Sequence, residues 1–392
     1  MVSVVAKANT VGLRLEVFEQ FPSGKGAMKQ WNSIVGDHPF LCYEWMSSWW
    51  ASYGGGKKDL RLLVAKQSNH SADAEDWVSL LPLYVETELA RGKVLRFLSN
   101  GRACGDHMAP AIKPGFEQAS FSLFSNWLVQ AANQQRCFDL IEWDGVDSAN
   151  PHVGRLLEAL ASREMQITTT DIEGSWTAML DKDWPSFEKR LKKCFRRKTR
   201  KASQNRELPN VDVQIVTSAS QIEKSWPIFV HLHQARRHSL GQKGCFHDSD
   251  FEQFLFLAIH KLAALGKVAM AIATHDDTPF GCNLVLIHGD QGYLYQTGQD
   301  PQFNHLEPGH LLVSAIIQHA ISIGLKHLAF LRGDEPYKAR WNTERQRMVR
   351  HRVIPRRWSA IQCDRVWQAG RTVKSLIRSM MKNESNEKRL QA

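Results

Sequence analysis

The sequence of 392 residues lacks several features that would place it in a specialised class. It contains no run of about 18 uninterrupted apolar residues, which argues against a transmembrane helix. Its seven cysteines lie far apart and form no CxxC pair, which argues against a disulfide framework and favours a reducing compartment. Residues 1–17 show no apolar segment followed by a small-residue cleavage site, so we expect no signal peptide and a cytoplasmic protein.

Several catalytic signatures are also missing. The chain has no GxSxG, no P-loop, no GxGxxG after a first strand and no HExxH, which disfavours serine hydrolases, NTPases, dinucleotide oxidoreductases and zincins. Histidines and Cys245 gather in residues 231–248, but their spacing matches no metal pattern, so no metal is expected. Cys104 and His107 are close in sequence without a third orienting group, and a structural thiol is the favoured interpretation.

Positive charge is concentrated in two segments. Residues 189–206 hold ten basic residues and no acidic one, and residues 340–382 hold twelve basic residues against two acidic ones. The formal net charge is +10, so the rest of the chain is acidic overall. Such segments attract polyanions, namely nucleic acid, anionic lipid or phosphorylated ligands, although a solvated helix face is an equally good interpretation.

An internal repeat of element types organises the chain. Alternating or continuous apolar runs and a helical stretch predict the order strand, strand, strand, helix, strand twice, at residues 60–67, 77–89, 94–101, 116–132 and 138–147, and again at 267–276, 280–290, 292–300, 308–324 and 327–336. Each copy ends in an apolar strand broken by a glycine beside acids, Gly145 and Gly333, 188 residues apart. We therefore expect two α/β domains, residues 1–170 and 171–360, followed by a basic amphipathic tail, residues 361–392.

Helical spacing predicts further elements around the repeat. Residues 41–53 place Trp45, Trp49 and Trp50 in a stripe that is expected to lie in the core. Residues 187–206, 220–240 and 248–265 are also predicted helices, the last with Asp248 as its N-cap.

Two loops could carry chemistry. Pro308 and Gly309 suit the first turn of a helix that follows a strand, where free N–H groups and the helix dipole favour an anion such as a pyrophosphate. The alternative is an ordinary helix start. Residues 331–341 bring two carboxylates, a phenol and several cations to the end of an apolar strand, which can supply a base, an acid and an anion anchor. The alternative is a surface turn with local ion pairs, such as Glu335 with Lys338.

Several segments together resemble one family, the FemAB-like branch of the GNAT acyltransferase superfamily, in its CelD-type group associated with cellulose and exopolysaccharide biosynthesis. The resemblance runs from about Pro39 to Arg352. Its most specific block is FLRGDEPYKARW (330–341), and looser ones are PFLCYEWMSSWW (39–50), VLRFLSNGRACGDHMAP (94–110), KKCFRRKTRK (192–201), LHQARR (232–237) and YLYQTGQDPQFNHLEPGHLL (293–312).

The resemblance implies two tandem GNAT-like domains, each with a mixed, mostly antiparallel sheet flanked by helices. It also implies that acyl-CoA or acetyl-CoA lies where two parallel strands separate, with its pyrophosphate at the following helix. The implied cofactor-binding residues are Gln296, Thr297, Gly298, Gly309 and His310. The usual Q/R-x-x-G-x-G/A phosphate loop is reduced to LEPGHL (306–311), and FemAB relatives use aminoacyl-tRNA instead. Both donors therefore stay open.

The resemblance implies an acyltransferase that moves an acyl group from a thioester to an amine or hydroxyl of an amino sugar or another envelope or exopolysaccharide precursor. The expected catalytic residues are Asp334 or Glu335 as base and Tyr337 as acid. The expected substrate-binding residues are Arg236, Arg332, Lys338 and Trp341.

Two alternatives remain at this point. One is aminoacyl transfer from charged tRNA, with residues 189–206 on the RNA phosphates. The other is a non-catalytic GNAT-fold scaffold in polysaccharide synthesis. Segments 189–206 and 340–382 could also contact an anionic membrane surface, which would place the protein at the inner face of the membrane.

Overall fold

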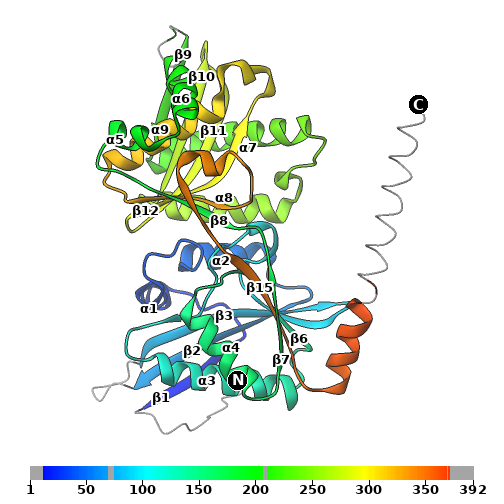
Figure 1. Cartoon of the computed structure of the whole chain (residues 1–392). Helices are drawn as coiled ribbons and strands as arrows, with labels where there is room; N and C mark the ends of the chain where they lie inside the picture. Colours follow the sequence, from blue (N-terminus) through cyan, green and yellow to red (C-terminus); the bar gives the residue numbers. More distant parts are fainter. Residues whose placement is uncertain (1–11, 69–74, 206–207, 209, 369, 371–392) are drawn as a thin grey trace, which may run out of the picture.

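The computed structural model describes residues 12–68, 75–205, 208, 210–368 and 370, and within them the chain forms two sheets (Figure 1). The strands of the first sheet are β1 (Leu13–Phe18), β2 (Lys58–Ser68), β3 (Glu75–Glu88), β4 (Gly92–Phe97), β5 (Ala111–Ile112), β6 (Leu140–Asp147), β7 (Gln166–Asp171) and β15 (Met348–Ile354). Those of the second sheet are β8 (Ser175–Met179), β9 (Val211–Val216), β10 (Val268–His275), β11 (Thr278–His288), β12 (Gln291–Gln299), β13 (His327–Arg332) and β14 (Thr343–Gln346).

The two sheets repeat one topology. The first has the order β1-β2-β3-β4-β6-β15-β7, with β5 beside β3, and the second has the order β14-β8-β13-β12-β11-β10-β9. In each sheet the strands of the predicted repeat, β2-β3-β4-β6 and β10-β11-β12-β13, are antiparallel except for the final pair, which is parallel. The expected fold class, two mixed and mostly antiparallel sheets flanked by helices, is confirmed.

Nine helices of the described residues pack on these sheets: α1 (Lys25–Val35), α2 (Tyr43–Tyr53), α3 (Glu117–Asn133), α4 (Pro151–Ala161), α5 (Trp184–Arg190), α6 (Lys193–Asn205), α7 (Ala219–Ser239), α8 (Ser249–Ala263) and α9 (Pro308–Ser322). A further helical segment covers residues 358–368. The predicted N-cap of α8 is confirmed, because the Asp248 side chain accepts a hydrogen bond from the backbone N–H of Asp250. Among the described residues, no helix combines the length and apolar character needed to span a bilayer.

One helix predicted over residues 187–206 is two helices. The chain leaves the helical conformation at Leu191, the C-cap of α5, whose backbone is extended, and α6 begins at Lys193. The side chain of Leu191 is buried in the core beneath α9, together with Phe195 of α6. The break between α5 and α6 therefore occurs where Leu191 is buried, and the run of basic residues in the sequence did not predict it.

The two faces of the second sheet pack against different apolar cores. The larger core is continuous from the first sheet, through α2, to α7 and α8. The predicted tryptophan stripe belongs to it: Trp45 and Trp49 are buried, and the ring centroids of Trp45 and Phe254 of α8 are 4.8 Å apart. The smaller core lies beneath α9 on the opposite face. The larger core therefore runs across the junction between the two sheets.

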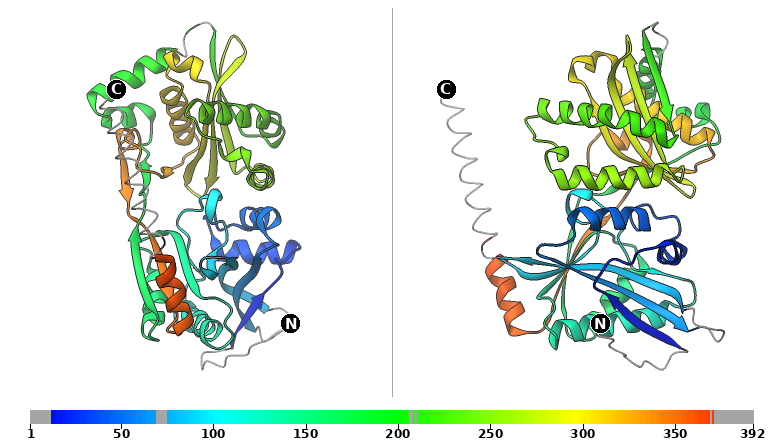
Figure 2. Two further views of the ribbon diagram at one scale, coloured as in Figure 1. Left: turned by 90° about the vertical axis from the view of Figure 1, so that its right-hand side faces the viewer. Right: turned by 180° about the vertical axis from the view of Figure 1, so that it is seen from behind.

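The chain crosses this junction twice. It passes from the first sheet to the second between β7 and β8, and it returns to the first sheet between β14 and β15 (Figure 2). The two connections lie side by side, because the backbone N–H of Ile172 donates a hydrogen bond to the carbonyl oxygen of Met348. We call residues 12–172 with 348–368 the first unit, and residues 173–346 the second unit.

The position of β15 differs from the expected division of the chain, which assigned all of residues 171–360 to the second domain. Strand β15 pairs on one side with β6 and on the other with β7, so it completes the first sheet. The helical segment 358–368 follows it, where Asp364 pairs with Arg352. The part of the predicted basic tail from 371 to 392 lies outside the described residues.

Candidate active site

A cavity of about 610 Å³ opens at the junction of the two units. The first unit lines it with residues of β6, of β15 and of the loop after β4, and the second unit with residues of β12, β13 and α7. The lining residues are Gly101, Cys104, Asp106, Asp144, Ile172, Glu173, Arg237, Leu294, Tyr295, Gln296, Thr297, Phe330, Leu331, Arg332, Glu335, Tyr337, Lys338 and Arg350.

The cavity enters the second sheet where β12 and β13 separate. The two strands pair only from Gln291–Tyr293 to His327–Ala329, and β13 continues along β8 on its other side. On the side of β11, Gln296 pairs with Leu284 while Leu294 pairs with Val285, which leaves Tyr295 as the extra residue of a β-bulge. Beyond Tyr293, the edge of β12 therefore faces the cavity instead of a neighbouring strand.

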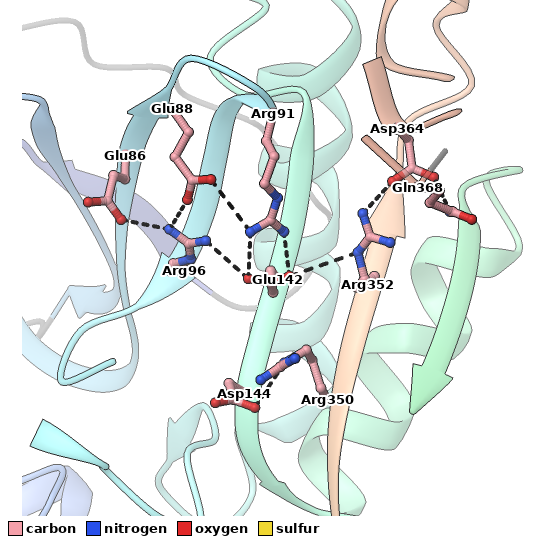
Figure 3. A network of polar contacts seen from close by, with 10 residues as sticks. All are labelled: Glu86, Glu88, Arg91, Arg96, Glu142, Asp144, Arg350, Arg352, Asp364 and Gln368. Carbon is pink, nitrogen blue, oxygen red and sulfur yellow. Dashed lines mark hydrogen bonds and ion pairs between the residues drawn. The ribbon is translucent and has the colours of Figure 1, made fainter. Parts of the chain in front are cut away.

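The equivalent position of the first sheet is closed. Strands β4 and β6 pair at Val94–Leu95 and Leu140–Ile141, and an ion pair follows, with the Arg96 Nη2 to Glu142 Oε1 distance at 3.0 Å. Arg91 also pairs with Glu142 (Figure 3). The ring centroids of Phe97 and Trp143, on the same two strands, lie 5.1 Å apart. Burial alone would raise the pKa of Glu142, but Arg91 and Arg96 outweigh it and hold the pKa at about 2.

Arg332, a predicted substrate-binding residue, holds the two units together. Its Nε and backbone N–H donate to the carboxylate of Asp106, at 2.6 and 2.9 Å, and its Nη1 donates to Asp144 at 3.2 Å. Asp144 and Arg332 precede the matching glycines of the repeat, so equivalent positions of the two units form an ion pair. Asp144 also accepts from Arg350 at 3.1 Å. Because its Nε and Nη1 are engaged with Asp106 and Asp144, the main role of Arg332 is to connect the two units.

The loop after β13 folds back on itself around Lys338. The buried Nζ of this lysine donates to the carbonyl oxygens of Leu331 and Arg332, at 3.1 and 2.7 Å, and lies 3.0 Å from Oε2 of Glu335. Three acceptors satisfy the three N–H groups of an ammonium, so Lys338 positions the loop and has no donor left for a substrate. Gly333 makes the fold possible, because its φ is 124° and a Cβ there would collide with the Glu335 carboxylate.

Glu335 and Tyr337 both reach the cavity from this loop. The side chain of Glu335 is 56% exposed, so its carboxylate is accessible to a ligand as well as to Lys338. Desolvation raises the pKa of the Tyr337 hydroxyl to about 12, and the negative charge of Glu335 adds to the effect. The phenol is therefore protonated at neutral pH and can donate a proton, beside a carboxylate that can accept one.

Asp334, the alternative base, does not line the cavity. Its carboxylate accepts hydrogen bonds from Nε and Nη2 of Arg345, at 2.8 and 2.9 Å, and from Nε1 of Trp176 at 3.2 Å. The hydrogen bonds from Arg345 lower the pKa of Asp334 to about 2. A carboxylate so engaged is a poor proton acceptor, and Glu335 is the better candidate.

Three consecutive residues of β12 were expected to bind the donor, but only two of them line the cavity. Gln296 and Thr297 line the cavity. Gly298 is buried under α7, where a Cβ would lie 2.5 Å from the backbone nitrogen of His233. The glycine therefore allows the close approach of α7 to β12, which corrects its assignment as a ligand-binding residue.

The comparisons agree with this architecture. Residues 189–339 match the family model for the acetyltransferase (GNAT) domain. The matched residues include α6, the two separating strands and the loop after β13. A search of the curated proteins found no match to this sequence.

Solved structures share the fold at low sequence identity. The crystal structure of FemX has a TM-score of 0.59 and 10% identity, and the match covers 82% of this chain and 95% of FemX. A conserved protein of unknown function from Bacteroides thetaiotaomicron has a TM-score of 0.53 and 10% identity, covering 87% of this chain and 99% of its own. The C-terminal domain of a putative lysylphosphatidylglycerol synthetase from Agrobacterium fabrum has a TM-score of 0.50 and 9% identity, covering 85% and 93%.

The predicted pyrophosphate position of the GNAT domain is the start of α9. Gly309 leaves open space there, because a Cβ at this residue would have no atom within 4 Å. The adjacent N-cap residue is Glu307, whose carboxylate lies 3.5 Å from Nζ of Lys198 on α6. A second anion at this helix end would meet the negative charge of Glu307.

His310 and Trp341 lie on the same side of the second sheet, away from the cavity lining. Phe195 of α6 has its ring centroid 4.9 Å from that of His310 and 5.0 Å from that of Trp341, and Trp341 is buried. Burial lowers the pKa of His310, with Lys198 as the next cause. Both side chains therefore pack against Phe195 of α6 within the second unit, and Trp341 is a core residue instead of the expected substrate contact.

The sequence missed part of the cavity. Arg237 lines it, whereas the predicted Arg236 does not. The sequence analysis also did not identify four other charged residues of the lining, Asp106, Asp144, Glu173 and Arg350. Only Asp144 had a signal in the sequence, because it is one of the acids beside Gly145 in the repeat. Within the described residues, no three His, Cys, Asp or Glu side chains are arranged to hold a metal ion.

Proposed function

We propose that the protein is an acyltransferase, with acyl-CoA as donor and an amine or hydroxyl as acceptor, and that transfer takes place in the cavity between the units. One observation carries the proposal. Of the two places where parallel strands separate, the one in the second sheet opens into a cavity that holds a carboxylate, Glu335, and a protonated phenol, Tyr337. The match of this unit to the GNAT acetyltransferase domain supports the same chemistry.

The reaction needs three groups around the thioester. The acceptor nitrogen or oxygen attacks the carbonyl carbon while Glu335 takes its proton. Backbone N–H groups at the bulge of β12, Tyr295 to Thr297, polarise the carbonyl oxygen. When the carbon–sulfur bond breaks, Tyr337 gives its proton to the departing thiolate. Proton transfer from Glu335 back to Tyr337, directly or through water, restores the starting state.

Two arginines of the cavity lining, Arg237 and Arg350, support an acceptor that carries an anionic group. Arg237 reaches it from α7, and Arg350 reaches it from β15 with one hydrogen bond to Asp144. Either guanidinium can bind a phosphate or carboxylate. An amino sugar or an activated envelope or exopolysaccharide precursor combines such an anion with the amine or hydroxyl that the reaction needs.

A second donor, charged tRNA, is favoured by the start of α9. The carboxylate of Glu307 stands where the resemblance would put a CoA pyrophosphate, and phosphate binding there would bring two anions together. An aminoacyl ester needs no pyrophosphate at that helix. The chemistry at Glu335 and Tyr337 is the same for both donors, because an acyl group is transferred from an oxygen or sulfur leaving group.

The proposal can be tested with purified protein, acetyl-CoA or charged tRNA, and a panel of free and nucleotide-activated amino sugars. Product formation is followed by mass spectrometry. We expect Glu335→Gln to lower the rate by at least about 100-fold, which is the usual contribution of a positioned base. Asp334→Asn is the matched control from the same loop and should retain most activity. Equal losses in both variants would remove Glu335 as the base, and no transfer from either donor would favour the scaffold function.

A further inference from the structure

The basic segment forms a rigid surface on the second unit. In α6, the side chains of Phe195, Thr199 and Ala202 are buried, and the small core beneath α9 includes Phe195. At 3.6 residues per turn, Lys193, Arg197 and Lys201 lie along the opposite side of the helix, and all three are exposed. We call these residues, with Lys189 and Lys192 at the end of α5 and after it, the α5–α6 face.

The cations of this face are not neutralised by neighbours. Three nearby acids have other partners: Asp181 pairs with Arg190, Glu188 with Arg200, and Glu307 with Lys198. A fourth, Asp183, accepts a hydrogen bond from the backbone N–H of Ser186, and its charge interacts with that of Lys189 without forming an ion pair. In the described part of the chain, the five side chains of the α5–α6 face make no ion pair. Five positive charges therefore stand together in solvent, and electrostatic repulsion between them is relieved by an anionic partner.

The shape of the face distinguishes between polyanions. Three of its five cations, Lys193, Arg197 and Lys201, stand on the outer side of α6, and no residue of α5 or α6 lines the cavity at the junction. Single-stranded nucleic acids are usually held in a positive groove with aromatic side chains for the bases, and α6 exposes no aromatic ring. A convex row of lysine and arginine suits a flat surface.

Apolar side chains accompany the cations at both ends. Met179 is 56% exposed just before α5, and its carbonyl oxygen accepts a hydrogen bond from Arg190. Leu208 is 46% exposed just after α6. Exposed apolar groups beside a basic helix favour a partner with both negative charge and an apolar interior.

We propose that the α5–α6 face rests on a lipid bilayer that contains anionic phospholipids. Helix α6 lies in the part of the second unit that is farther from the first unit, and α5 lies at its side (Figure 1), so the cavity at the junction would stay uncovered. The docked protein would act on substrates that are bound to, or diffuse along, that membrane. This inference goes beyond the proposed reaction and does not depend on the donor.

The test is co-sedimentation of the full chain with vesicles of phosphatidylcholine alone and of phosphatidylcholine mixed with phosphatidylglycerol. We expect binding to the anionic vesicles only, weakened by high salt. The variant Lys193→Glu/Arg197→Glu/Lys201→Glu should bind at least about 100-fold more weakly, since each cation near such a surface is worth about a factor of five. The control Lys25→Glu/Lys29→Glu/Lys224→Glu changes the net charge by the same amount at exposed sites elsewhere and should bind like the original protein.

Three results would overturn the proposal. Equal binding to neutral and anionic vesicles would show that charge is not the cause. Equal losses in the two triple variants would show that net charge matters and the face does not. Binding of tRNA that the α6 substitutions abolish, without binding to anionic vesicles, would assign the face to RNA. Circular dichroism and thermal melting of both variants establish that each is folded.

Discussion

Gly298 and Gly309 offer a matched pair of substitutions, because both were expected to bind a donor and the structure separates them. A Cβ at Gly298 would lie 2.5 Å from the His233 nitrogen and 2.8 Å from the Leu232 carbonyl carbon, both in the backbone of α7. Ordinary contact begins near 3.4 Å, so α7 would have to move by about 1 Å. No atom lies within 4 Å of a Cβ at Gly309.

We expect Gly298→Ala to lower the free energy of unfolding by about 3 kcal/mol, at the upper end for overpacking, because helix backbone cannot turn aside as a side chain can. Gly309→Ala should leave stability unchanged or raise it by up to about 1 kcal/mol, since alanine is the better helix former. Urea unfolding followed by tryptophan fluorescence measures both. Because the slope with urea depends on the surface exposed on unfolding, the two variants should share one slope, and the midpoint of Gly298→Ala should lie at the lower urea concentration.

The reasoning fails if Gly298→Ala is as stable as the original protein. In that case α7 is not fixed against β12, and a role of Gly298 in binding regains support. A loss of stability in Gly309→Ala would equally contradict the open space at the start of α9. Donor binding, measured separately by calorimetry, shows whether Gly309 contributes to a ligand site without affecting the fold.

Three further predictions concern charge and pH. Arg332→Met should destabilise the protein by about 3–5 kcal/mol, because it leaves the buried carboxylate of Asp106 without its partner, and adding Asp106→Asn should restore part of the loss in urea unfolding. The pKa of Glu142 is about 2 when folded, below its unfolded value, so the stability it contributes is present above about pH 5 and is lost towards pH 2; Glu142→Gln should flatten this part of the pH–stability curve. Burial lowers the pKa of His288 to about 4, so its contribution is lost as the pH falls from about 6.5 to 4, and His288→Leu should make thermal unfolding less sensitive to pH in that window. No change in slope for either variant would contradict the assignment.

Much of the fold follows from patterns that are local in sequence. Apolar runs of strand length and one helix in each copy predicted the order of elements in the repeat, and the structure confirms that order. The parallel pair that ends each copy was implied by the family resemblance and not by the apolar runs. The tryptophan stripe of α2 and the cap at Asp248 depend on neighbours within a few residues, so the sequence contained the information needed to predict them.

The remainder depends on distant contacts. The sequence of β15 does not say which sheet receives the strand, and only its pairing with β6 and β7 decides. The partners Asp106 and Arg332 are 226 residues apart. In the site, Asp334 and Glu335 are adjacent, and the turn of the chain at Gly333 determines which carboxylate faces the cavity. No local pattern distinguishes such pairs of neighbours.

Amide hydrogen exchange with and without acetyl-CoA tests the central claim most directly, because it reports which of the two strand separations receives the donor. We predict slower exchange in residues 294–299 and 329–337 of the second unit when acetyl-CoA is present, and no change in β4 and β6 of the first unit. Protection of β4 and β6, or exchange that acetyl-CoA leaves unchanged throughout, would contradict acyl transfer from CoA in the cavity between the units.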